Sequence, residues 1–248
     1  MFIDTHCHLS IEDYDDIDKV VKEDIEAGVK KLIVSACTKN TFEEALALAK
    51  KYDLIYVTLG FHPSEVDTTD ADLELLEELL KTDKVVGVGE IGLDYHYGKD
   101  DIDMQKELFE KQLVIAEKLN LPVVIHSRDA VNDTIETLKK HNVKGVIHCF
   151  SGSVETADIY IRLGYKLGIG GVVTFKNSNL YKVVEHVGLD NIVLETDSPY
   201  LAPEPFRGKQ NSSKYIPVIA TKIADILNVS LSEVEDKTTM TASNLFDL

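Results

Sequence analysis

The sequence predicts a (β/α)₈ barrel, and three observations lead to this fold class. Short apolar, β-branched runs recur eight times along the chain and indicate strands. Segments with apolar residues at helical spacing separate the runs, which is typical of βαβ units and a parallel sheet. Eight such units in 248 residues match the usual size of a closed barrel. A doubly wound open sheet is the alternative.

The expected strands start near the first residue and recur at intervals that leave room for a helix. They cover residues 2–9, 31–37, 55–61, 85–93, 122–127, 145–150, 165–171 and 191–197. With 44% hydrophobic residues the chain can bury one large core. We therefore expect a single barrel domain over residues 1–248.

The segments between the strands are amphipathic. The segment 41–52 begins with Thr41, which we expect as its N-cap, and Glu44 three residues later would complete a capping box. The segments 71–80, 103–120 and 133–140 have the same helical spacing. The last part of the chain, from residue 214 to residue 248, predicts helix only.

Composition narrows the class of partners. The net charge of −17 argues against a large basic surface that would hold duplex nucleic acid through many phosphates, so no stable duplex binding is expected. The chain has no apolar stretch long enough to span a bilayer and no signal-peptide pattern, so no membrane partner is expected. Three cysteines without a CxxC pair indicate a reduced, cytoplasmic protein without disulfides. A monomer is compatible with this composition.

The first expected strand carries two histidines two positions apart. Residues at this spacing in a strand point to the same side, so His6 and His8 face one way. The pair could bind a metal ion, since neutral imidazole is a common ligand, or it could form hydrogen bonds inside a core.

Further polar residues lie at or near the ends of other expected strands. The six candidate metal ligands at strand ends are His6, His8, Glu90, His126, His148 and Asp197. A closed barrel brings all these strand ends to one face, whereas an open sheet would separate the first strand from the last. Burying several such groups without a partner would cost several kcal/mol, which favours a metal site.

The donor set indicates the kind of metal centre. Nitrogen and oxygen ligands without thiolate suit Zn, Mn, Fe, Ni, Co or Mg. Six ligands exceed what one open catalytic site needs and suit two divalent ions roughly 3.5–4 Å apart with a bridging carboxylate. Glu90 is the natural bridge.

Cys7 and Cys149 alternate with His6 and His148 along the chain. We therefore expect the two thiols to face away from the histidines and to pack between barrel and helices; the alternative is a thiolate ligand.

Six motifs resemble a known family when they are taken together. DTHCHL, GFHP, GEIGLDYH, HSRDA, HCFSG and ETDSPYLAPEPFRGKQNSS occur in this order, between residue 2 and about residue 213, and resemble the TatD family of metal-dependent hydrolases in the amidohydrolase superfamily. The resemblance implies a TIM barrel and metal ligands at the same six residues. It also implies metal-dependent DNase activity, described for the family as 3′→5′ exonuclease action on single strands.

Cationic and aromatic residues within these motifs are candidates for substrate contacts. We expect Arg128 and Arg207 to bind phosphate, because guanidinium matches phosphate bidentately, whereas a solvated loop position is favoured for Lys209. Tyr95 and Phe150 could stack on a terminal base or could pack in the core.

Two further polar residues have different expected roles. His62 is expected to contact substrate or act as an acid or base, and not to bind a metal ion. Glu195 shares a face with Asp197 but lies deeper, so we expect it to support a ligand.

The function expected from these residues is two-metal phosphodiester hydrolysis that trims single-stranded DNA ends. Asp197 and Glu90 are the expected catalytic residues, Asp197 as the base that orients a water molecule and Glu90 as the bridge. The alternatives are the same chemistry on an ester or amide bond, as in a D-aminoacyl-tRNA deacylase, and a non-catalytic metal-binding barrel, because the fold does not determine the substrate.

Overall fold

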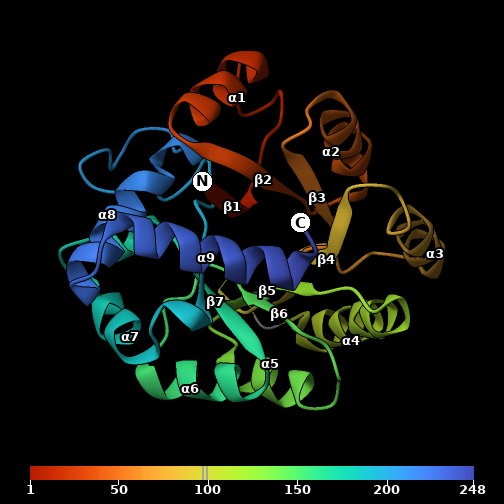
Figure 1. Ribbon diagram of the computed structural model, residues 1–248. Coiled ribbons are helices and arrows are strands. Elements are labelled where there is room, and N and C mark those ends of the chain that lie inside the picture. Colours follow the sequence, from red (N-terminus) through yellow and green to blue (C-terminus); the bar gives the residue numbers. More distant parts are fainter. Residues whose placement is uncertain (97, 99) are drawn as a thin grey trace.

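The computed structural model describes residues 1–96, 98 and 100–248, and in it eight parallel strands pair in chain order. Figure 1 shows the strands inside a ring of helices. The strands are β1 (Phe2–Cys7), β2 (Val29–Ala36), β3 (Ile55–Leu59), β4 (Val85–Asp94), β5 (Val123–Arg128), β6 (Gly145–Ile147), β7 (Tyr165–Ile169) and β8 (Ile192–Leu194). The predicted (β/α)₈ barrel is confirmed.

The helices follow the strands around the outside of the barrel. They are α1 (Ile17–Glu26), α2 (Lys39–Lys51), α3 (Asp70–Leu79), α4 (Ile102–Leu119), α5 (Val131–Leu138), α6 (Val154–Arg162), α7 (Leu180–Val187), α8 (Ile216–Leu227) and α9 (Leu231–Phe246). Three short 3₁₀ segments complete the chain: η1 (Gly171–Thr174), η2 (Leu189–Asn191) and η3 (Ser213–Tyr215). No helix in the described part of the chain is both long and apolar enough to cross a bilayer.

The first and last strands meet just beyond the end of β8. Cys7 forms a parallel bridge with Ser198, and the His8 amide donates a hydrogen bond to the Ser198 carbonyl at 2.7 Å. The Asp197 amide donates to the His6 carbonyl at 3.0 Å. The loop after β8 therefore closes the barrel against β1, and this seam runs through residues expected to bind metal.

A buried aspartate reinforces the seam. Asp4 in β1 is fully buried, and its carboxylate accepts hydrogen bonds from the hydroxyls of Thr196 and Ser213, both at 2.6 Å. It also accepts a hydrogen bond from the Thr196 amide at 3.1 Å. One side chain thus links β1 to the loop after β8 and to η3.

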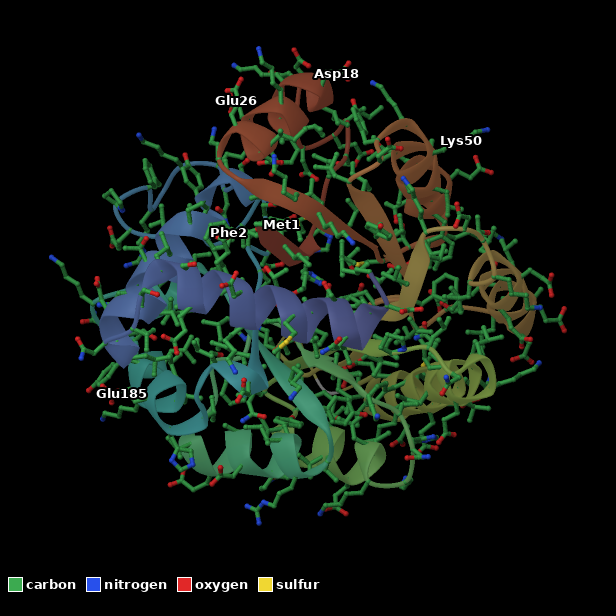
Figure 2. The ribbon with its side chains drawn as sticks, viewed as in Figure 1. Met1, Phe2, Asp18, Glu26, Lys50 and Glu185 are labelled. Atoms are coloured by element: carbon green, nitrogen blue, oxygen red, sulfur yellow. The ribbon has the colours of Figure 1, made fainter. Side chains whose placement is uncertain are left out.

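The barrel interior forms a second, smaller core that α9 covers. This inner cluster consists of Ile3, Ile33, Val86, Val124, Val146 and Val193 from the strands, with Ala242 and Phe246 from α9. The Thr239 hydroxyl of α9 donates to the Met1 carbonyl at 2.6 Å, and Figure 2 places Met1 beside this helix. Because α9 closes the amino-terminal end of the barrel, the carboxyl ends of the strands form the open mouth.

The start of α2 differs from the expectation. The N-cap is Thr38, whose backbone is extended, and Thr41 lies in the first turn, where its hydroxyl accepts a hydrogen bond from the Thr38 amide at 3.2 Å. Glu44 instead accepts a hydrogen bond from the Ile11 amide at 2.8 Å. The predicted N-cap at Thr41 is wrong because a second threonine completes the capping box one turn earlier.

Candidate metal centre

Glu90 lies at the middle of the mouth, and its two carboxylate oxygens face different histidines. It sits in β4 and is 4% exposed. Oε1 lies 2.6 Å from His126 Nδ1 and 2.9 Å from His148 Nε2. Oε2 lies 3.5 Å from His6 Nε2 and 3.9 Å from His8 Nε2. One carboxylate therefore touches two pairs of imidazoles.

The pair on the Oε2 side includes a third candidate ligand. The Nε2 atoms of His6 and His8 are 3.3 Å apart, and each lies 3.6 Å from Asp197 Oδ1. His8 Nδ1 faces the Ser35 carbonyl at 3.1 Å. A carbonyl can only accept, so Nδ1 carries a proton and Nε2 is the nitrogen that faces the cluster.

The pair on the Oε1 side has carboxylates behind it. His126 Nε2 lies 3.1 Å from Asp94 Oδ2, and His148 Nδ1 lies 3.7 Å from Glu195 Oε1. In metal sites the nitrogen that does not bind the ion usually faces such a group, which sets the tautomer and the ring orientation. Asp94 and Glu195 are placed for this role, and His126 Nδ1 and His148 Nε2 are the nitrogens that face Glu90.

Glu195 needs a glycine beside it. A Cβ atom at position 168 would lie 2.0 Å from Glu195 Oε2, so only Gly168 leaves space for this fully buried carboxylate. Its Oε1 also accepts a hydrogen bond from the Cys149 amide at 2.5 Å. β7 and the turn after β6 thus hold Glu195 behind His148.

Two candidate ligand positions depend on unusual backbone conformations. Asp197 follows the end of β8 and has φ of +55°, and Cys149, next to His148, has φ of +46°. These left-handed conformations are uncommon for residues other than glycine and cluster at functional sites. Both strands end earlier than expected, and the turns that follow them carry His148 and Asp197 to the mouth.

The six predicted ligands form one cluster. The ligand atoms of Glu90, His126 and His148 lie within 4.8 Å of one another, and so do those of His6, His148 and Asp197. The rings of His6 and His148 stack with their centroids 4.1 Å apart. The structure thus brings together every residue for which the sequence predicts metal binding.

The electrostatics of the cluster favour bound positive charge. Burial opposes ionisation of Glu90, but the imidazoles of His148 and His126 outweigh burial and hold its pKa well below the usual range. Burial likewise opposes protonation of His148, yet the facing Glu90 and Glu195 raise its pKa. Divalent cations supply positive charge without such protons, so the donor set and its charge fit a metal centre.

His62 lies beside the cluster as a hydrogen-bond donor. Its Nδ1 accepts a hydrogen bond from the Ser64 amide at 3.1 Å, so the neutral ring carries its proton on Nε2. Burial lowers the pKa of His62 to about 4, and the ring centroid lies 4.7 Å from that of His126. A neutral imidazole that donates from Nε2 can bind an oxygen atom of a substrate.

One of the predicted phosphate-binding arginines ends a strand and the other lies in a loop after a strand. Arg128 ends β5 and is exposed. The Arg207 guanidinium lies 4.6 Å from the centroid of the Phe175 ring, in the loop region after β8. Lys209 is exposed, with its ammonium 5.9 Å from the Phe206 ring.

The two predicted aromatic platforms have different surroundings. Tyr95 is half-buried, and its hydroxyl donates a hydrogen bond to Asp133 at 2.8 Å. Phe150 is 4% exposed and packs edge-on against Tyr160. Phe150 therefore belongs to the core, which was the alternative to base stacking.

Three residues of the mouth were missed by sequence reasoning. Asp94 shares strand parity with Glu90, so its place beside His126 could have been inferred. Cys37 ends the second apolar run, and its Sγ lies 3.6 Å from Glu90 Oε2. Tyr200 is 58% exposed, with its ring centroid 6.2 Å from that of His8. Tyr200 belongs to the motif after β8, and no periodic pattern marks it.

Known proteins resemble this chain along nearly its whole length. The family model described as TatD related DNase matches residues 3–247. The chain is 40% identical to the uncharacterized metal-dependent hydrolase YabD of Bacillus subtilis over 99% of both chains. It is 34% identical to the uncharacterized metal-dependent hydrolase MJ1582 of Methanocaldococcus jannaschii over 95% of this chain and 92% of the relative.

Solved structures give the same result. The crystal structure of YjjV, a TatD homologue from Escherichia coli, superimposes with a TM-score of 0.93 at 33% identity, over 100% of this chain and 98% of that one. A TatD family hydrolase from Entamoeba histolytica shares the fold, with a TM-score of 0.89 at 24% identity over 99% of this chain and 97% of that one. The chain therefore belongs to the TatD family of metal-dependent hydrolases.

Proposed function

We propose that this metal-dependent hydrolase is a two-metal phosphodiesterase that trims single-stranded DNA ends in the 3′→5′ direction. The observation that carries the proposal is that the two carboxylate oxygens of Glu90 face different pairs of histidines. Oε2 faces His6 and His8, and Oε1 faces His126 and His148. A carboxylate shared in this way is the bridge that a binuclear centre requires.

In the proposed centre each half has its own ligands. His6, His8 and Asp197 would hold one ion together with Glu90 Oε2, and His126 and His148 would hold the other together with Glu90 Oε1. When bound, the two ions would lower the pKa of a water molecule and polarise a phosphoryl oxygen.

The side chains around the centre would perform the other steps. Asp197 would accept the proton of the attacking water, because its carboxylate is partly exposed at the mouth. His62 would donate a hydrogen bond from Nε2 to a non-bridging phosphate oxygen and stabilise the charge that develops there. Arg128 and Arg207 would bind the phosphates next to the bond that is cleaved.

The net negative charge of the protein supports cleavage at the ends of a DNA strand. A protein with a net charge of −17 repels a long polyanion, so binding along a strand should be weak. In the proposal the positive groups that bind the substrate are the two metal ions, Arg128 and Arg207, and all of them belong to one mouth. A pocket admits a strand end more readily than an internal phosphate. A duplex should be a poor substrate, because unpairing an end costs a few kcal/mol per step.

The test compares three substrates with Mg²⁺ or Mn²⁺ present. The purified protein should degrade a linear single strand from its 3′ end, with low processivity, and should leave a closed single-stranded circle intact. Equal rates of degradation of the linear strand and the closed circle would indicate an endonuclease. Hydrolysis of aminoacyl esters without any cleavage of DNA would instead indicate a deacylase with the same metal chemistry.

A further inference from the structure

The Cys37 thiol lies beside the proposed centre. It directly follows the end of β2, as His8 follows β1 and His148 follows β6. Its Sγ lies 3.6 Å from Glu90 Oε2, the oxygen that also faces His6 and His8. The sulfur therefore belongs to the Oε2 side of the centre.

The surroundings of the thiol leave it free to bind an ion. Its other contacts in the described part of the chain include the Ser35 hydroxyl at 3.8 Å and the Ser35 carbonyl at 3.9 Å, which are weak thiol interactions. Cys37 is partly exposed and lines a cavity of about 440 Å³ together with His8 and Tyr200. Ions and solvent can thus reach the sulfur from the mouth.

The charge of the cluster leaves room for another anionic ligand. Among the described residues, the ion pairs of Glu90 and Asp197 are all with histidines, so no lysine or arginine competes for these carboxylates. Glu90 and Asp197 would neutralise only half of the charge of two divalent ions, and the other two carboxylates of the cluster, Asp94 and Glu195, lie on the Oε1 side, behind His126 and His148. A thiolate on the Oε2 side would neutralise part of the remainder.

We propose that the Cys37 thiolate is a further metal ligand on the Oε2 side, and that it makes this side prefer thiophilic ions such as Zn²⁺, Co²⁺ or Cd²⁺ over Mg²⁺. On binding, the sulfur–hydrogen bond breaks, the proton leaves to solvent, and a sulfur lone pair binds the ion. No oxidation or reduction takes place. The inference rests on the binuclear centre proposed above.

Cobalt absorption spectroscopy tests this proposal without an activity assay. The full-length protein is stripped with a chelator and titrated with Co²⁺. The visible ligand-field bands report cobalt in the site, and a near-ultraviolet charge-transfer band reports a cobalt–sulfur bond. The native chain should show both signals. Cys37→Ser and Cys37→Ala should keep the visible bands and lose the near-ultraviolet band.

The matched control is Cys149→Ser, which removes the thiol next to His148 and should keep both signals. Affinity gives a second readout: Cys37→Ser should weaken Co²⁺ or Cd²⁺ binding by about tenfold or more and leave Mn²⁺ binding unchanged. Visible bands without a near-ultraviolet band in the native chain, or a near-ultraviolet band that survives in Cys37→Ser, would overturn the inference alone. The absence of visible bands in the native chain would overturn the metal centre as well.

Discussion

At the scale of single residues, the candidate site depends on a carboxylate that several imidazoles share. Glu90 is buried and contacts four histidines from β1, β5 and the turn after β6. Residues that contact the same side chain are energetically coupled, so a substitution of that side chain affects all of them. Replacing Glu90 should therefore affect both halves of the centre, whereas replacing an outer ligand should affect one half.

Glu90→Gln should lower metal content on both sides, because an amide carries no negative charge and cannot bridge two cations. We expect the affinity for both ions to fall by about tenfold or more, with a matching loss of hydrolysis. Elemental analysis after dialysis measures the metal content. Asp129→Asn, which changes an exposed carboxylate after β5, is the control and should keep full content. Full metal content and full activity in Glu90→Gln would rule out the bridge.

Arg207→Ala should raise KM for single-stranded DNA by about tenfold, because a charge-assisted contact to phosphate contributes about 1.5–3 kcal/mol. Metal content should stay unchanged, since Arg207 stacks on Phe175 and not on a ligand. Arg162→Ala is the matched control: this arginine lies in the last turn of α6, at the amino-terminal end of the barrel. If neither Arg207→Ala nor Arg128→Ala alters KM, the phosphate assignment is wrong.

At the scale of elements, the alternation of apolar runs and amphipathic segments predicts all eight strands and four of the helices between them, α2 to α5. It gave no range for α1, α6 or α7. The strand prediction succeeds because parallel strands are buried on both faces and their sequences are continuously apolar. The ends of the elements were harder to predict. β8 stops at Leu194, three residues before Asp197, and a left-handed backbone at Asp197 replaces the expected strand alternation. The six candidate ligands were still identified because their residue types, and not their strand parity, marked them.

The individual side-chain contacts of the site could not be predicted in the same way. The tautomer of His8 depends on the Ser35 carbonyl, and Glu195 depends on the space left by Gly168. These contacts join segments far apart in the sequence, and no local pattern encodes them. Cys37 was overlooked because the expected donor set contained no sulfur.

The element with the clearest energetic role is α9, which closes the amino-terminal end of the barrel. Phe246 is 2% exposed and packs against the inner cluster, so Phe246→Ala should lower the free energy of unfolding by about 3–5 kcal/mol. Urea denaturation measures the change. Met240→Ala, at a position of the same helix that is 50% exposed, should change stability by less than about 0.5 kcal/mol. Equal effects of the two changes would contradict this role for α9.

At the scale of the whole molecule, the chain carries a large negative charge of −17. Most acidic side chains are exposed, where they favour solubility and repel polyanions. A few are buried and couple the stability of the molecule to pH. Asp24 in α1 is 1% exposed, and its carboxylate accepts a hydrogen bond from the Ser212 hydroxyl at 3.1 Å. The nearby Lys214 ammonium pairs with Glu23 at 2.7 Å.

Burial raises the pKa of Asp24 to about 6. The folded protein thus retains this proton at pH values where the unfolded chain, with an aspartate pKa of about 3.9, has lost it. The stabilising contribution is complete below about pH 4 and is lost as pH rises through about 6. Asp24→Asn should remove this loss and should raise stability at neutral pH by roughly 3 kcal/mol relative to the native chain.

Urea titrations at several pH values measure this dependence. The control is the exposed Asp225→Asn in α8, which should follow the native pH profile. A native and an Asp24→Asn profile that remain parallel between about pH 4 and pH 7 would show that this carboxyl does not titrate on folding.

The seam between β1 and the loop after β8 has a consequence for local opening. His6 and His8 lie on one side of it and Asp197 on the other, so the cation of the proposed centre, held by all three, would link the two sides. Brief separation of the seam would release the cation, and bound cation should make such separation rarer. Amide hydrogen exchange should therefore slow most at His8 and Asp197, whose N–H groups cross the seam, when Zn²⁺ or Mn²⁺ is added. If hydrogen exchange slows evenly over the whole barrel, the cation stabilises the entire fold and not this seam in particular.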